Sequence, residues 1–128
     1  MICRNILKLA LCVSVGLTAC VLADIGDGAW LRRVPTKERT RKNPFAENSQ
    51  AVAAGHKLFE ENCSKCHGMD EEGKKDRPSL HSERVHSATA GELHWLLTNG
   101  SLRNGMPNWS RLPDPERWQL VTFLKSLK

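Results

Sequence analysis

Tyrosine is absent from this sequence, and the other aromatic residues are few: four Trp and three Phe among 128 residues. A chain of this length has room for one domain, and no internal repeat indicates a solenoid. A domain of about 85–100 residues buries only a thin core and often depends on a metal, a disulfide or a cofactor. A buried group would supply the apolar mass that the aromatic side chains do not.

A long hydrophobic run is also missing. The main uncharged apolar stretch is residues 9–19, which is shorter than the about 20 residues of a transmembrane helix. It follows Arg4 and Lys8 and ends in small residues, the pattern of a secretory signal peptide. A short buried helix of the domain is the alternative. We expect residues 1–23 to direct export to the periplasm, where a nucleic-acid partner is not expected.

Two processing sites compete at the end of this segment. A cut after Ala23 fits the small residues before it, whereas Leu17-Thr18-Ala19-Cys20 resembles a bacterial lipobox. In the second case residues 1–19 are a lipoprotein signal, and lipidated Cys20 anchors the protein to the periplasmic side of a membrane. Cys3 and Cys12 leave with the signal on either route. Too few cysteines then remain for the disulfide framework of a secreted domain.

Residues 24–44 are basic, with six Lys or Arg against three Asp or Glu, whereas residues 45–128 hold eleven of each. The basic segment contains Pro35 and Pro44 and has no apolar periodicity. We therefore predict a linker over 24–44 before a domain at 45–128. A solvated tether is one interpretation, and an arm for anionic lipid or an acidic partner is the other.

Helical periodicity and capping residues predict three main helices, over residues 49–62, 90–99 and 115–127. Asn48 or Ser49 can cap the first, Thr89 begins a capping box for the second, and Asp114 is the expected N-cap of the third. A loop is expected over residues 68–87. Since no segment alternates with period two, the predicted fold class is all-α.

The chemistry of the chain is concentrated in Cys63-Ser64-Lys65-Cys66-His67, a C-x-x-C-H sequence typical of c-type haem attachment. Two thiols about one turn apart can add to the two vinyl groups of one haem and form two thioethers. The next residue, His67, then lies under the iron. Its Nε2 can bind the metal while Nδ1–H donates to a backbone carbonyl.

Other sites can contain such a sequence. A thioredoxin-like C-x-x-C expects a strand and helix of an α/β domain, which this chain does not supply. A zinc site needs further ligands, for which His81 and His86 are available. A plain disulfide across so small a loop would be only structural.

Met106 is the expected second axial ligand of the iron. It lies between Gly105 and Pro107 in a polar loop, where a methionine does not resemble a core residue. A soft thioether opposite a histidine raises the reduction potential. His81, His86 and His94 are rival ligands, and ligation by two histidines would lower that potential.

Residues 45–128 resemble a class I bacterial cytochrome c domain. The matching stretches, in the order of the family, are residues 54–59 (AGHKLF), 63–68 (CSKCHG), 77–80 (RPSL), 93–100 (LHWLLTNG) and 105–107 (GMP). The resemblance implies a cytochrome c fold with three main helices and loops wrapped around one covalently attached haem. The absence of Tyr and the segment 24–44 depart from the minimal family domain.

Specific roles also follow from the resemblance. Gly55 and Phe59 match the positions where the first helix crosses the last, near Trp118 and Thr122. Pro78 matches the proline whose carbonyl accepts the His67 Nδ1–H. The resemblance also implies three further residues at the haem pocket, Leu80, Trp95 and Trp109. The two Trp can instead be ordinary core residues.

The resulting expectation is a monomeric single-electron carrier, not an enzyme, with His67 and Met106 on one haem c. Its redox partners would be a dehydrogenase or a terminal oxidase. One alternative is an electron-acceptor subunit docked on such an enzyme through residues 24–44, so that deleting them weakens binding. Another is a ligand-binding or peroxidatic haem protein in which Met106 is labile.

Overall fold

The computed structural model describes residues 28–127. The predictions for residues 1–27, which include the signal peptide, both processing sites and Cys20, lie outside the described residues and stay predictions. No helix within 28–127 combines the length and the apolar character that crossing a bilayer requires.

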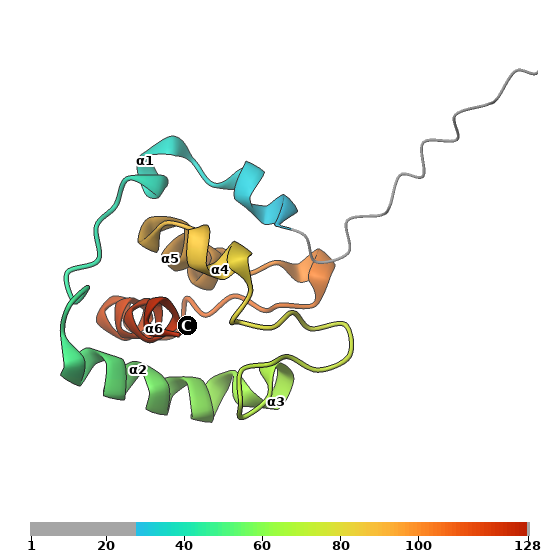
Figure 1. Ribbon diagram of the computed structural model, residues 1–128. Helices are drawn as coiled ribbons and strands as arrows, with labels where there is room; N and C mark the ends of the chain where they lie inside the picture. Colours follow the sequence, from blue (N-terminus) through green and yellow to red (C-terminus); the bar gives the residue numbers. More distant parts are fainter. Residues whose placement is uncertain (1–27, 128) are drawn as a thin grey trace, which may run out of the picture.

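The regular elements of the described chain are all helical (Figure 1). Two isolated β-bridges, Lys74 with Arg77 and Ser101 with Met106, are its only pairing of extended segments. The predicted all-α class is confirmed. In chain order the elements are η1 (Ala29–Arg33), α1 (Thr36–Arg39), α2 (Ser49–Asn62), α3 (Ser64–His67), α4 (Glu83–Ser87), α5 (Ala90–Asn99), η2 (Leu102–Asn104) and α6 (Asp114–Ser126).

Local capping explains where α2 and α5 begin. The Asn48 side chain accepts a hydrogen bond from the Ala51 backbone N–H at 3.0 Å. Thr89 and Glu92 form the reciprocal capping box of α5. Both helices match their predicted bounds because these signals lie within a few residues of the helix ends.

The prediction of Asp114 as the N-cap of the last helix is wrong. Pro113 is the N-cap, and its carbonyl accepts from the backbone N–H groups of Glu116 and Arg117. The Asp114 carboxylate instead accepts from the Arg117 guanidinium at 2.9 Å and lies 3.0 Å from His94 Nε2. The predicted loop over 68–87 is also too simple, since its last residues form α4.

The crossing of α2 over α6 is the main contact between helices (Figure 1). A Cβ atom placed on Gly55 would lie 2.1 Å from the Gln119 carbonyl oxygen and 2.8 Å from Phe123 Cβ. The rings of Phe59 and Phe123 pack with their centroids 5.5 Å apart. The predicted crossing is therefore confirmed, one residue further along α6 than expected.

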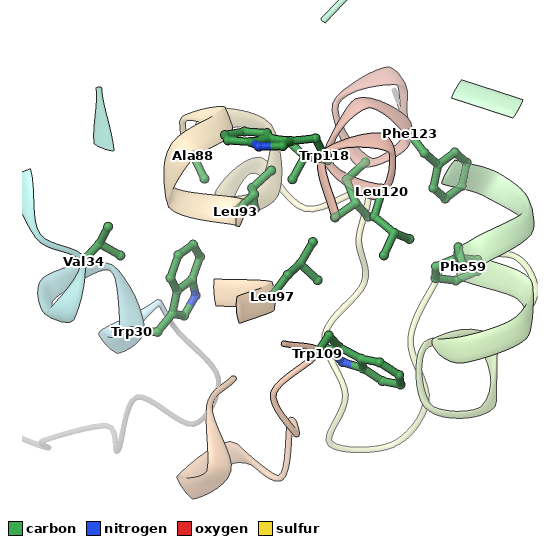
Figure 2. Close-up of a cluster of buried hydrophobic side chains, with 12 residues drawn as sticks. Trp30, Val34, Phe59, Ala88, Leu93, Leu97, Trp109, Trp118, Leu120 and Phe123 are labelled. Carbon is green, nitrogen blue, oxygen red and sulfur yellow. The ribbon is translucent and has the colours of Figure 1, made fainter. Parts of the chain in front are cut away.

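The hydrophobic core lies between α2, α5 and α6 and extends to the segment before them. Phe59, Leu120 and Val121 are its most completely buried large side chains. Figure 2 shows Trp30, from the N-terminal segment, on the side of Leu97 opposite to α2. The core is thus larger than the three predicted helices alone provide.

The prediction of a linker over 24–44 is wrong for its described part. Trp30 and Val34 are 8% and 4% exposed and belong to the core. The backbone of α1 also touches α5, because a Cβ atom on Gly91 would lie within 1.9 Å of the Glu38 carbonyl oxygen. We call residues 28–44 the N-terminal cover, since they form one wall of the folded unit.

Polar contacts hold the cover in place. Arg39 donates to the Glu92 carboxylate at 3.1 Å and to the carbonyls of Leu31 and Val34 at 2.5 and 3.1 Å. Asn43 donates to the Trp118 carbonyl at 3.1 Å. The folded unit therefore begins well before residue 45. The apolar residues of the N-terminal cover show no periodicity, because arginines and prolines separate them in the sequence.

Candidate functional site

The C-x-x-C-H residues form a single turn at the end of α2. The Cys63 N–H donates to the Phe59 carbonyl at 2.8 Å and ends that helix. The Cys63 carbonyl then accepts from the N–H groups of Cys66 and His67, both at 3.0 Å, and this closes the turn of α3. Cys63 is half-buried and Cys66 is exposed, and both are free thiols. Two thiols on one accessible turn is the arrangement that double thioether attachment requires.

The acidity of the Cys63 thiol does not match that of a reactive redox cysteine. Burial, and secondarily the charge of neighbouring Cys66, raises the pKa of Cys63 to about 11. A reactive cysteine of the thioredoxin kind has its pKa lowered instead. The site therefore disfavours disulfide-exchange chemistry.

His67 is oriented by the carbonyl that the resemblance implied. Its Nδ1 lies 3.2 Å from the Pro78 carbonyl oxygen. Because a carbonyl only accepts, Nδ1 carries the proton and Nε2 keeps its lone pair. Burial lowers the pKa of His67, an effect that the bond to Pro78 opposes and the charge of Arg77 reinforces. The imidazole is thus neutral, which is the form that binds a metal.

These side chains follow a helical turn and do not surround a point. Among residues 28–127, no three His, Cys, Asp or Glu side chains converge so as to hold a bare metal ion. His81 Nε2 contacts the Asp70 carbonyl at 3.2 Å, and it lies 3.6 Å from Glu71. Thiols on one turn beside an oriented imidazole fit a haem, whose porphyrin brings the metal.

Met106 follows η2 within residues 101–107, which we call the Met106 loop. Its backbone pairs with Ser101 in both directions, at 2.8 and 3.1 Å. The side chain is half-buried and packs against the core. Arg77 Nη1 donates to the Asn104 carbonyl at 2.5 Å. Arg77 directly precedes Pro78, so this hydrogen bond connects the Met106 loop to the segment that contains Pro78. The structure therefore joins the Met106 loop to the segment whose Pro78 carbonyl orients His67.

Several apolar side chains near these segments are only partly covered. Leu80 is half-buried against the core, and Trp109 is buried, with its backbone N–H donating to the Leu97 carbonyl at 2.7 Å. Figure 2 shows the Trp109 ring pointing away from the N-terminal cover. Met69 and Leu102 are 62% and 75% exposed. Such a set suits the edge of a large apolar group, so the residues present fit a haem.

Trp95 lies on α5 and is partly buried against the core. It lines a hollow of about 340 Å³ between α5, the start of α6 and the N-terminal cover, together with Pro35, Glu38 and Arg41. Its predicted role in the haem pocket stays a prediction.

The His94 side chain is engaged in contacts between α5 and α6. It is buried, stacks on Trp118 with ring centroids 4.0 Å apart, and contacts the Asp114 carboxylate through Nε2 at 3.0 Å. Burial lowers the pKa of His94 although the charge of Asp114 opposes the shift. Its role is to join α5 to α6, which removes it as a rival of Met106.

Arg77 is the site residue that sequence reasoning missed. A single arginine in a polar loop carries no periodicity or motif that predicts a long-range contact. The adjacent Pro78 was found only because the family resemblance extends over residues 77–80. The partner of Arg77, a carbonyl 27 residues away, is a product of the tertiary fold.

Comparison with known proteins is consistent with this geometry. The family described as "Cytochrome C oxidase, cbb3-type, subunit III" matches residues 50–124. A Cbb3-type cytochrome c oxidase subunit CcoP of Rubrivivax gelatinosus is 35% identical over 73 residues, which is 56% of this chain and 24% of that protein. Cytochrome c550 of Pseudomonas aeruginosa is 27% identical over 93 residues, covering 67% of this chain and 62% of its own length.

A solved structure gives the same result for the fold. Cytochrome CL of the marine methylotroph Methylophaga aminisulfidivorans superposes with a TM-score of 0.59 at 27% identity, covering 68% of this chain and 59% of that one. The chain thus spans less than two thirds of each of these relatives. The family match covers more than half of the chain, and the helical fold agrees with it. The chain therefore belongs to the cytochrome c family, a family defined by covalently bound haem c, and has the cytochrome c fold.

Proposed function

We propose that this protein is a single-electron carrier with one haem c, bound through thioethers at Cys63 and Cys66. His67 and Met106 are its proposed axial ligands. The observation that carries the proposal is the oriented His67 imidazole, whose Nδ1–H donates to Pro78 and whose Nε2 is available beside two free thiols. The proposal assigns no catalytic residue.

The bound haem would supply a metal that changes oxidation state by one electron. The chain's own residues would hold this metal in one ligand set. His67 is fixed by the Pro78 carbonyl, and the backbone pairing of Ser101 with Met106 shapes the opposite loop. Apolar residues such as Leu80 and Trp109 would exclude water and favour the less charged reduced state.

We propose periplasmic export, with a membrane tether if Cys20 is lipidated. The partner would be a dehydrogenase or a terminal oxidase, in keeping with the oxidase subunit among the relatives. The N-terminal cover supports a docking role near the Met106 loop, because Arg33 donates to the Ser101 hydroxyl at 3.3 Å and thus brings positive charge there. Deletion of the whole segment no longer tests docking by itself, since it also removes Trp30 and Val34 from the core.

Mass and visible spectra of the purified mature protein test the proposal. We expect the mass of one haem on the chain, low-spin bands when reduced, and a weak near-infrared band from the Met–iron bond. The mass also reports the processing site and any lipid on Cys20.

Two methionine variants identify the ligand. Met106→Leu should abolish the near-infrared band while it nearly preserves side-chain volume. Met69→Leu, in an exposed methionine of the same protein, should leave it unchanged. High-spin bands or ready CO binding in the unmodified protein would instead favour the ligand-binding alternative.

A further inference from the structure

We propose that Arg77 is a positioning residue that holds the Met106 loop closed and so determines how readily another ligand displaces Met106. This inference rests on the proposed function, because it assumes that Met106 binds the iron. It concerns a residue to which neither the sequence motif nor the family resemblance gives a role. The evidence is the contact of the Arg77 side chain with the residues directly before Met106.

The guanidinium lies against the backbone of the Met106 loop. Nη1 donates to the Asn104 carbonyl at 2.5 Å. A Cβ atom on Gly105 would lie 2.6 Å from Nη1 and 2.8 Å from Nη2. The φ angle of Gly105 is +70°, in the region that favours glycine. Glycine at this position therefore allows both the turn and the close approach of the arginine.

The backbone of Arg77 is itself firmly held. Its N–H donates to the Lys74 carbonyl at 2.8 Å, and its carbonyl packs so closely on Gly73 that a Cβ atom there would lie 2.3 Å away. The next residue, Pro78, accepts from His67. The dipeptide Arg77–Pro78 thus contacts both proposed ligand segments. The Arg77 guanidinium contacts the Met106 loop, and the Pro78 carbonyl contacts His67 of α3.

The competing partner of Arg77 is weak. Asp76 lies 3.8 Å from Nε, and its side chain is 70% exposed. An exposed ion pair between neighbouring residues contributes little, whereas a hydrogen bond from a charged donor to a carbonyl is stronger than a neutral one. Moving the Met106 loop away must break that stronger bond, so Arg77 opposes the exchange of Met106.

Imidazole binding to the oxidised haem protein measures this exchange. Arg77→Gln should bind imidazole roughly three- to tenfold more tightly than the unmodified protein, because loop opening no longer breaks a charged hydrogen bond. Arg77→Lys should restore part of the difference, since it keeps one charged donor. Lys75→Gln removes the same charge from the same loop and should leave the affinity unchanged. Lys75 is exposed, and no described residue pairs with its side chain.

A double-mutant cycle tests the contact itself. Gly105→Ala should also tighten imidazole binding, because its Cβ atom displaces the guanidinium and because alanine strains the backbone at a φ angle of +70°. In the Arg77→Gln background only the backbone strain remains, so the same change should have a smaller effect. Additive effects of the two changes would overturn the proposal.

The remaining outcomes separate this inference from the proposed function. If the unmodified protein lacks the near-infrared Met–iron band, the ligand assignment fails and the inference fails with it. If the band is present and Arg77→Gln binds imidazole as the unmodified protein does, only the inference is overturned. The inference is also overturned if Arg77→Gln lowers the thermal stability without changing imidazole affinity, because Arg77 would then have a structural role and would not control the exchange of Met106.

Discussion

Gly55 shows how one residue sets the distance between two helices. The space for its missing side chain is filled by the α6 backbone, with the Gln119 carbonyl carbon 2.7 Å from the position of a Cβ atom. Phe59, one helical turn later, then reaches Phe123. Both residues precede the C-x-x-C-H turn on the same helix, so the α2–α6 distance also positions the proposed haem site.

Replacing Gly55 with alanine should destabilise the protein, although alanine is the better helix former. Helix propensity alone favours Gly→Ala by about 1 kcal/mol. The added methyl group must push α6 away, and overpacking of this kind costs about 1–3 kcal/mol. Urea unfolding of the haem-loaded protein measures the sum. Ala53→Gly at an exposed position of α2 is the control, with a loss of about 1 kcal/mol at most. A stabilised Gly55→Ala protein would disprove the close crossing.

At the scale of elements, the N-terminal cover is the segment for which the prediction from sequence was wrong. Its composition suggested a solvated chain, yet α1 packs on α5, Trp30 of η1 belongs to the core, and Asn43 binds the Trp118 carbonyl of α6. Burial of Trp30 and Val34 compensates for the ordering of a charged segment. By contrast, α2 and α5 were predictable to the residue, because Asn48, Thr89 and Glu92 act within one turn.

Truncation of Trp30 distinguishes a packed cover from a tether. Trp30→Ala should lower the free energy of unfolding by about 3–5 kcal/mol, since a large aromatic side chain leaves the core. Arg32→Ala, in the same 3-10 helix but exposed, should change it by less than about 0.5 kcal/mol. Chemical denaturation followed by Trp fluorescence measures both. Equal midpoints for the two variants would restore the linker interpretation.

At the scale of the whole molecule, charge is unevenly distributed. The formal net charge of the chain is +5, whereas residues 45–128 are balanced. Because the cover is packed on the domain, its arginines are held at fixed positions rather than on a moving arm. Arg33 is fixed beside Ser101, whose backbone pairs with Met106.

Fixed positive charge near the Met106 loop should accelerate electron transfer to anions. The double variant Arg32→Gln/Arg33→Gln should slow oxidation of the reduced protein by ferricyanide roughly two- to tenfold at low salt. It should accelerate oxidation by the cationic tris(phenanthroline)cobalt(III) complex. Both effects should disappear at 1 M salt, where the screening length is about 3 Å. Stopped-flow absorbance measures the rates.

A second double variant tests whether position matters beyond net charge. Lys37→Gln/Lys42→Gln removes the same charge from exposed positions in or just after α1, whose Glu38 lies at Gly91 near the start of α5. We expect a smaller effect there. Equal effects from both variants would show that only the total charge acts.

The sequence by itself determined the features that depend on neighbouring residues. The Cys63-to-His67 spacing predicts haem attachment because the reaction needs two thiols on one turn, and the N-caps of α2 and α5 lie beside the helices they begin. The tertiary structure decided the features that join distant residues: the burial of Trp30, the commitment of His94 to Asp114, and the contact of Arg77 with Asn104. Such contacts arise from the packing of helices, and neither local propensity nor periodicity specifies which distant side chains will meet.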